Sequence, residues 1–109
     1  MIIKDVVVLD EVTNDIIAGK SFYNENEKGI GTYFQDSIIA DIESLFIYAG
    51  VHSKLFGFYR MSTKRFPYVI YYHVHNNVAI VVAVLPMRRN PNWVKGKLKK
   101  EANRVARDL

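Results

Sequence analysis

Hydrophobic positions along the chain follow two different periods, and the change of period predicts the fold. From Asp10 to Asn26, and again from Ile30 to Ala49, apolar side chains recur every three or four residues, which is typical of helices that bury one face. The segment Asn24–Gly31, where the two helices meet, is polar and carries two glycines, so we expect it to be a turn and the two helices to form an antiparallel hairpin. Gly50 stands where a glycine commonly ends a helix.

Before and after this hairpin, β-branched and aromatic runs predict strands. A short strand is expected at Lys4–Leu9, and three more at Leu55–Met61, Phe66–His75 and Val78–Leu85. The last run is almost continuously apolar, which is typical of a central strand covered on both faces, and Pro86 ends it. The sequence therefore predicts an α+β domain in which a two-helix hairpin packs on an antiparallel sheet of about four strands.

Asn76 and Asn77 predict a two-residue hairpin turn between the last two strands, because asparagine tolerates a positive φ. A turn of that length fixes which residues lie opposite one another. The expected pairs are Ile70–Ala83, Tyr72–Val81 and Val74–Ala79 on one face, and Tyr71–Val82 and His73–Ile80 on the other. The alanines leave room on the first face, so we expect the helical hairpin to pack there.

The formal net charge of +4 is concentrated at one end of the chain. Residues 1–87 carry seven Lys/Arg against nine Asp/Glu, which gives −2, whereas residues 88–109 carry eight against two, which gives +6. A local basic field favours phosphates or an acidic protein partner. We divide the chain into a domain at residues 1–93 and a basic extension at residues 94–109. The extension has the apolar spacing of a helix, at Val94, Leu98, Ala102, Val105 and Leu109.

Several classes of function find no support in the sequence. The chain has no cysteine, which excludes disulfides and thiolate chemistry and suits a cytoplasmic location. It contains no phosphate-cradling glycine motif, so we expect no nucleotide cofactor. It shows neither a leader peptide nor an apolar run of about 18 residues, so we expect no membrane association. His73 and His75 have a spacing that suits zinc, with His52 as a third ligand, but ordinary strand histidines are the better interpretation and we expect no metal.

Two stretches of the sequence resemble a known family. The stretch Arg65–Tyr72 reads RFPYVIYY, and the ending Arg88–Pro91 reads RRNP and is followed by Trp93. Both resemble the RelE/ParE family of bacterial toxins, particularly its ParE-like, plasmid-stabilisation branch, as does the turn Gly29–Phe34. The resemblance covers roughly residues 4–93. It implies the fold of that family and a growth-inhibiting toxin of a type II toxin–antitoxin system, neutralised by a cognate acidic antitoxin. Family members either poison DNA gyrase or cleave mRNA in the ribosome.

Arg88, Arg89, Asn90 and Trp93 are the candidates for binding a target. They directly follow a buried strand, so rigid structure can aim them, and arginine pairs bind phosphates or carboxylates strongly. The plain alternative is a solvated strand end.

A ribonuclease would need a different set of residues. Attack by a 2′-hydroxyl requires a general base and a general acid in addition to charge stabilisation. The candidates are Arg60, Arg65, Tyr71, His73 and Arg88, with His75 as a further proton carrier. No Tyr or His follows Pro86, which favours a gyrase poison without nuclease activity over an mRNA endoribonuclease. A basic nucleic-acid-binding or interaction module without toxicity is the third hypothesis.

Overall fold

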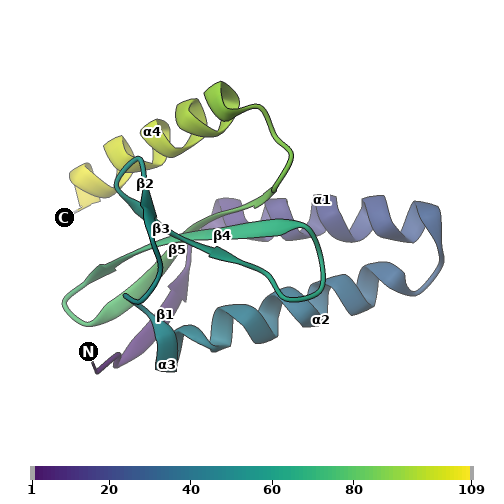
Figure 1. Ribbon diagram of the computed structural model, residues 1–109, viewed down its shortest axis with the longest axis horizontal. Helices are drawn as coiled ribbons and strands as arrows, with labels where there is room; N and C mark the ends of the chain where they lie inside the picture. The colour runs from purple at the N-terminus through teal and green to yellow at the C-terminus, as the bar shows by residue number, and fades with distance from the viewer. Residues whose placement is uncertain (1, 109) are drawn as a thin grey trace.

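The sheet has five strands, and two long strands form its centre (Figure 1). The computed structural model describes residues 2–108, with the surroundings of side chains up to Arg104. The order of the strands in space is β1-β5-β4-β3-β2, and all neighbours are antiparallel except β1, which runs parallel to β5. The strands are β1 (Asp5–Val8), β2 (Lys54–Leu55), β3 (Phe58–Ser62), β4 (Tyr68–His75) and β5 (Val78–Pro86).

The predicted α+β fold class is confirmed, while the sheet has one strand more than expected and contains one parallel pair. The extra strand arises because Phe56 and Gly57 both have positive φ, at 52° and 87°, and turn the chain back on itself. The prediction of a single strand at Leu55–Met61 is therefore wrong, because this turn separates β2 from β3. Hydrophobic alternation does not reveal such a turn when it carries a phenylalanine.

Residues 2–108 also form four helices, and the sequence predicts α1 (Asp10–Asn26) at its observed bounds. The second predicted helix is divided into α2 (Ile30–Glu43) and α3 (Leu45–Tyr48). The break lies at Ser44, whose hydroxyl donates to the carbonyl oxygen of Asp41 at 2.6 Å and competes with the helical backbone. The basic extension is also helical, as predicted, because α4 covers Pro91–Asp108.

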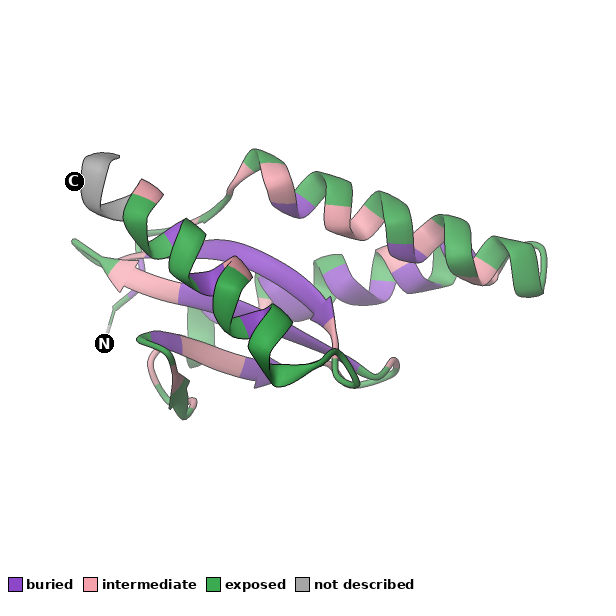
Figure 2. Ribbon diagram, turned by 90° about the horizontal axis from the view of Figure 1, so that it is seen from above, coloured by how far each residue is buried: buried purple, intermediate pink, exposed green. Residues whose placement is uncertain are grey.

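The helices cover the two faces of the sheet. The α1–α2 hairpin packs on one face and α4 crosses the other, as Figures 1 and 2 show. The core under the hairpin includes Phe34, Ile38 and Tyr72, all fully buried. The core under α4 is smaller, and α4 contributes Val94 and Leu98 to it. The predicted apolar stripe of α4 is buried at these two positions and exposed at Ala102, whereas the side chains of Val105 and Leu109 lie outside the described residues.

The predicted pairing of β4 with β5 is confirmed near the turn and wrong farther from it. Tyr72, His73 and Val74 lie opposite the expected partners Val81, Ile80 and Ala79. Beyond them a β-bulge between Tyr71 and Tyr72 shifts the register by one residue, so the actual pairs are Tyr71–Ala83 and Ile70–Val84. The bulge also places Ala83 in the core under α4, so only Ala79 lies on the hairpin side as predicted.

The turn between β4 and β5 has the conformation that the sequence predicts. Asn76 and Asn77 have φ values of 50° and 63°, which suit a two-residue hairpin turn.

The helical hairpin closes at Gly31, where a Cβ would meet the carbonyl oxygen of Lys20 at 2.3 Å. The Gly31 amide donates to the side-chain oxygen of Asn24 at 2.8 Å, so the turn needs both residues.

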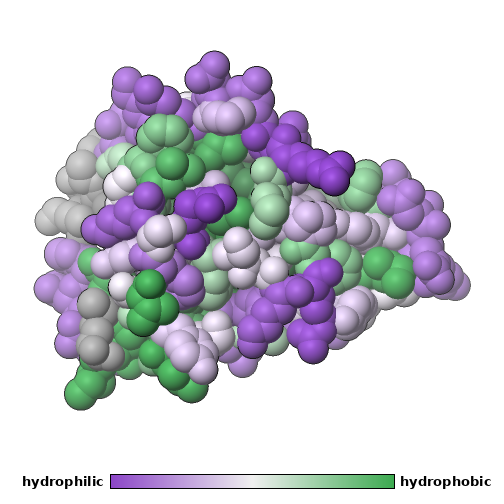
Figure 3. Space-filling view, in the orientation of Figure 1, coloured by the Kyte–Doolittle hydropathy of each residue, from purple (hydrophilic) through white to green (hydrophobic). Residues whose placement is uncertain are grey.

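The surface combines charged and apolar areas. In the space-filling view, hydrophobic side chains gather at the corner where α3 and the N-terminal segment lie (Figure 3). Among residues 2–108, no helix has the length and apolar character needed to cross a membrane.

Candidate functional site

A groove of about 490 Å³ opens between α1, the ends of β4 and β5, and the first turns of α4. Its wall is mostly apolar and aromatic, and its cations come from the chain that follows β5. We call it the cationic groove. The lining residues used below are Gly19, Phe22, Tyr68, Arg88, Arg89 and Trp93.

Backbone hydrogen bonds hold the segment that carries the two arginines. The Met87 amide donates to the carbonyl oxygen of Pro67 at 2.8 Å, and the Arg89 amide donates to that of Pro86 at 3.2 Å. Asn90 precedes α4 and caps its first turn, because its side-chain oxygen accepts the Asn92 amide at 2.8 Å. The structure thus gives Asn90 a capping role and leaves Arg88 and Arg89 exposed between two fixed points.

Trp93 lies between two cations at the mouth of the cationic groove. The guanidinium carbon of Arg89 is 4.5 Å from the centroid of the indole ring, and the Lys97 ammonium is 5.6 Å from it. Both distances suit cation–π attraction. The ring nevertheless stays 42% exposed, so a ligand can still reach it. Among the described residues, neither Arg88 nor Arg89 forms an ion pair with a carboxylate.

The wall of the groove depends on a glycine in α1. A Cβ at Gly19 would meet the ring of Phe34 at 2.5 Å and the Tyr68 hydroxyl at 3.2 Å, so glycine lets α1 approach the sheet closely. Tyr68 is buried there, and burial is the main reason why its pKa is raised. The nearby Tyr23 raises the pKa of Tyr68 further, while Arg89 acts in the opposite direction.

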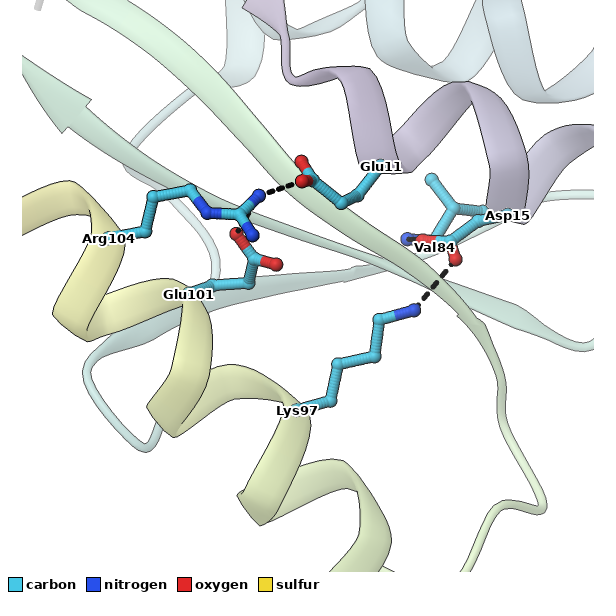
Figure 4. Close-up of polar contacts among 6 residues, drawn as sticks. All are labelled: Glu11, Asp15, Val84, Lys97, Glu101 and Arg104. Atoms are coloured by element: carbon cyan, nitrogen blue, oxygen red, sulfur yellow. Dashed lines mark hydrogen bonds and ion pairs between the residues drawn. The ribbon is translucent and has the colours of Figure 1, made fainter.

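Polar contacts with α1 and β5 hold α4 in place (Figure 4). Asp15 accepts hydrogen bonds from the Lys97 ammonium at 2.8 Å and from the Val84 amide at 3.0 Å. One turn earlier on α1, Glu11 pairs with Arg104. Because Asp15 neutralises Lys97, Arg88 and Arg89 are the cations that remain available in the groove.

Glu101 is the buried carboxylate of α4. Its exposed fraction is 2%, and its nearest cation is Arg104, at 3.7 Å between Oε2 and Nη1. Burial raises the pKa of Glu101, although Lys97 and Lys100 lower it in part. This group lies away from the arginine pair, because it faces Glu11 rather than the groove.

A second set of predicted residues lies on the face of the sheet under α4. Arg60 lies opposite Tyr71 in the β3–β4 pairing, and His73 follows on the same face of β4. The Nε of Arg60 and the Nε2 of His73 are buried without a hydrogen-bond partner among the described residues. Burial lowers the pKa of His73, and His75 lowers it further. Tyr71 belongs to the core that α4 covers.

The predicted site residues therefore divide into two groups. Arg88, Arg89 and Trp93 share the cationic groove. Arg60, Tyr71 and His73 lie outside this groove, on the face of the sheet under α4, and we call them the sheet-face group. Arg65 belongs to neither place, because it is exposed in the loop between β3 and β4. Lys97 and the aromatic wall complete the groove from other elements, and no pattern in the sequence indicates that they lie there.

The histidines weighed as zinc ligands are also separated, because His52 and His73 lie on opposite faces of the sheet. His52 lies on the hairpin side, where its Nδ1 contacts the Tyr72 hydroxyl. Within the part of the chain that the structure describes, no three His, Cys, Asp or Glu residues are grouped to hold a metal ion.

Comparison with known proteins shows a related fold but no related sequence. Neither protein-family models nor curated proteins show a match to the sequence. The structure is similar to a chain in the solved structure of the chromosomal ParDE TA system from P. aeruginosa, with a TM-score of 0.70 and 12% sequence identity. The similarity covers 80% of this chain and 98% of that chain. At this level of identity, the likeness establishes the shared fold.

Proposed function

We propose that this chain is the toxin of a type II toxin–antitoxin system and that its cationic groove binds the target. The observation that carries the proposal is the pair Arg88 and Arg89, which carry no ion pair among the described residues and stand beside the exposed ring of Trp93. The fold, shared with a chain of a ParDE TA system, supports the same conclusion, as does the resemblance of the Arg88–Pro91 ending. Cations and an aromatic ring on a rigid support are typical of a surface that binds a large partner.

The chemistry of the groove favours binding over catalysis. Proton transfer near neutral pH needs a group whose pKa lies close to neutrality. The groove offers Tyr23 and Tyr68, and the pKa of each is raised above the ordinary value of 10.0 by burial. Asp15 is engaged by Lys97 and the Val84 amide. We therefore favour a gyrase poison of the ParE type, with Arg88 and Arg89 binding the target and no cofactor.

An mRNA endoribonuclease is the second candidate, and the sheet-face group favours it. Arg60 and His73 carry buried atoms without partners, and the lowered pKa of His73 suits a neutral base. Two facts count against it. Tyr71 is buried in the core that α4 covers, and Arg88 lines a groove to which this group does not contribute.

The antitoxin in this proposal is an acidic protein. Residues 88–109 carry a net charge of +6, from eight Lys/Arg against two Asp/Glu, which favours association with an acidic segment. Coexpression of the cognate acidic protein should restore growth, because it would neutralise these charges and cover the groove.

The test is the double substitution Arg88→Ala/Arg89→Ala, expressed from an inducible promoter. Wild-type expression should stop growth, and the double variant should not. Its Tm should stay near that of the wild type, because removal of exposed arginines costs within about 0.5 kcal/mol. The matched control, Lys95→Ala/Lys99→Ala, removes the same charge from exposed positions of α4 outside the groove and should remain toxic.

The response of the cells separates the three hypotheses. Induction of the DNA-damage response with intact bulk mRNA supports the gyrase assignment. Rapid, translation-dependent cleavage of mRNA would replace it with the ribonuclease assignment and direct mutagenesis to Arg60, Tyr71 and His73. Vigorous growth with a high yield of the folded wild-type chain would favour the interaction module without toxicity. A double variant that remains fully toxic would show that the two arginines of the groove are not needed for growth arrest.

A further inference from the structure

An uncharged part of the chain is exposed on the hairpin side of the sheet. Residues 44–53 contain no Lys, Arg, Asp or Glu, although 24% of the whole chain is charged. This stretch includes α3, which lies against β1. Together with the N-terminal segment it forms what we call the uncharged corner, where Figure 3 shows hydrophobic side chains gathered. Its members are Ile2, Phe46, Ile47, Tyr48 and Val51, all exposed.

Buried contacts fix the orientation of the uncharged corner. Leu45 is fully buried, and Ala49 is 5% exposed, so α3 must turn its other side chains outward. The chain after α3 is held by the buried Tyr72, whose hydroxyl accepts the Gly50 amide at 2.9 Å and contacts Nδ1 of His52. The apolar side chains of the corner therefore belong to a rigid surface and cannot simply fold away from water.

The exposed apolar area is large for a protein of this size. Ile2 and Ile47 are 84% and 75% exposed, and the five members together expose roughly 600–700 Å² of side chain and backbone, which is at the upper end of the range of about 300–600 Å² for the largest apolar patch of a typical monomer. Two copies of the patch would remove at most roughly 1,200–1,400 Å² from water, and stable protein–protein interfaces begin at about 1,200 Å². The area therefore reaches the lower end of what a stable dimer needs.

We propose that the uncharged corner binds a second copy of this chain in a two-fold symmetric dimer. A two-fold contact places the same patch on both sides, so the patch must be complementary to itself. Residues 44–53, the main part of the corner, meet this condition, because they carry no charge and no like charges approach one another there. An acidic partner is instead attracted to the opposite face of the sheet, where the basic α4 lies.

The contact is expected through side chains rather than through extension of the sheet. β1 is an edge strand, and extension would need its free backbone groups. The Asp5 carboxylate already accepts the Val6 amide at 2.8 Å and places a charge at this edge. α3 and Val51 therefore provide the core of the dimer contact, and β1 lies at its border.

Sedimentation velocity of the full chain tests the proposal over a range from about 1 to about 100 μM, because interfaces of standard size at the weak end of their range have a Kd on the order of micromolar. The wild type should pass from monomer to dimer. Ile47→Glu should be monomeric throughout, since two carboxylates would meet at the contact, and its Tm should equal that of the wild type at the lowest concentration, where both are monomers. Ile17→Glu is the matched control: Ile17 is 58% exposed on α1, outside the corner, and this variant should dimerise like the wild type.

A cysteine crosslink identifies the face that is used. The chain has no cysteine of its own, so Ile47→Cys introduces a single thiol. Under mild oxidation it should give a disulfide-linked dimer severalfold faster than Ile17→Cys. A wild type that stays monomeric over the whole range overturns the proposal, and so does a dimer that Ile47→Glu leaves intact. The result is independent of toxicity, so this proposal and the proposed function can fail separately.

Discussion

The cationic groove and the uncharged corner both expose aromatic side chains, but the surroundings of these side chains differ. At the groove, Trp93 lies between Arg89 and Lys97. At the corner, Phe46 and Tyr48 belong to ten consecutive residues without a charge, 44–53. Apolar area contributes affinity at either place, whereas charge determines the choice of partner. The two proposals therefore use surfaces that do not compete, one for a charged macromolecule and one for a second copy of the chain.

The two surfaces also differ in what holds them in place. α3 at the corner is fixed by the fully buried Leu45 and by the hydroxyl of the buried Tyr72. α4 at the groove buries Val94 and Leu98 and otherwise depends on polar contacts such as Lys97 with Asp15. A single polar substitution should therefore loosen the groove and leave the corner unchanged.

Of the substitutions predicted here, Asp15→Ala should have the largest effect, and this effect should be confined to the groove. It leaves Lys97 unpaired and removes the acceptor of the buried Val84 amide, so we expect a loss of about 3 kcal/mol in the free energy of unfolding. α4 should detach more readily, which would weaken growth arrest. Denaturant unfolding and the emission of the single tryptophan, Trp93, measure the two effects.

Two controls test whether the effect of Asp15→Ala is confined to α4. Asp15→Asn keeps an oxygen for the Val84 amide and should lose less stability. Dimer formation, if it occurs at the corner, should persist in folded Asp15→Ala. Loss of the dimer together with growth arrest would show that the two surfaces are coupled and that the contrast between them is wrong.

Acidification should have a smaller effect, and it should act on the corner. Burial lowers the pKa of His52 below its ordinary value of 6.5, so just below that pH the folded chain binds fewer protons than the unfolded chain. The stability linked to His52 is complete above about pH 6.5 and is lost as the pH falls through the lowered pKa. Protonated Nδ1 can only donate to the Tyr72 hydroxyl, so the hydroxyl proton loses this acceptor, which should cost at most about 1 kcal/mol and loosen the dimer.

The measurement is Tm and dimer fraction against pH, between about 5 and 8, the range in which histidines titrate. His52→Gln does not titrate and should flatten part of the slope. The pKa of His73 is also lowered by burial, so a residual slope should remain. His75→Gln should remove only the part that His75 contributes to the lowered pKa of His73, and it should leave the part of the slope that depends on His52 unchanged. If wild type and His52→Gln gave equal curves, His52 would not contribute to the stability of the corner.

The long elements of the fold could be predicted because each is encoded by many residues. The helix Asp10–Asn26 and the strands on both sides of Asn76 follow hydrophobic periods that one unusual position cannot hide. The missed features each depend on one or two residues. Ser44 breaks a helix through one hydroxyl, and Phe56 turns the chain with a φ that its type rarely adopts. The bulge beside Tyr72 leaves no mark on the hydrophobic pattern, because valine and alanine suit both cores.

The candidate site could be predicted only where it is contiguous in sequence. Arg88, Arg89 and Trp93 follow one strand, so their common location could be expected from the chain alone. Asp15 and Lys97 meet from different helices, and no spacing in the sequence indicates that contact. Strand alternation placed Tyr71 and His73 on one face, but it could not show that α4 covers that face.

The smallest expected effect concerns the two hairpin turns, one beside each surface. Asn77 lies beside the N-terminal segment, because its carbonyl oxygen accepts the Lys4 amide at 2.9 Å, whereas Phe56 lies under Lys95 of α4. Asn77→Gly should be neutral or stabilising by a few tenths of a kcal/mol, since glycine adopts its φ of 63° without strain. Gly57→Ala, where φ is 87°, should cost about 1 kcal/mol.

Neither exchange touches a side chain of the groove or the corner, so growth arrest and dimer formation should follow stability alone. Thermal unfolding of both variants, alongside the two functional assays, tests this expectation. A marked fall in Tm for Asn77→Gly would mean that the asparagine side chain, rather than its backbone conformation, stabilises the turn. A change in dimerisation at unchanged Tm would show that the dimer contact includes the β4–β5 turn as well as α3.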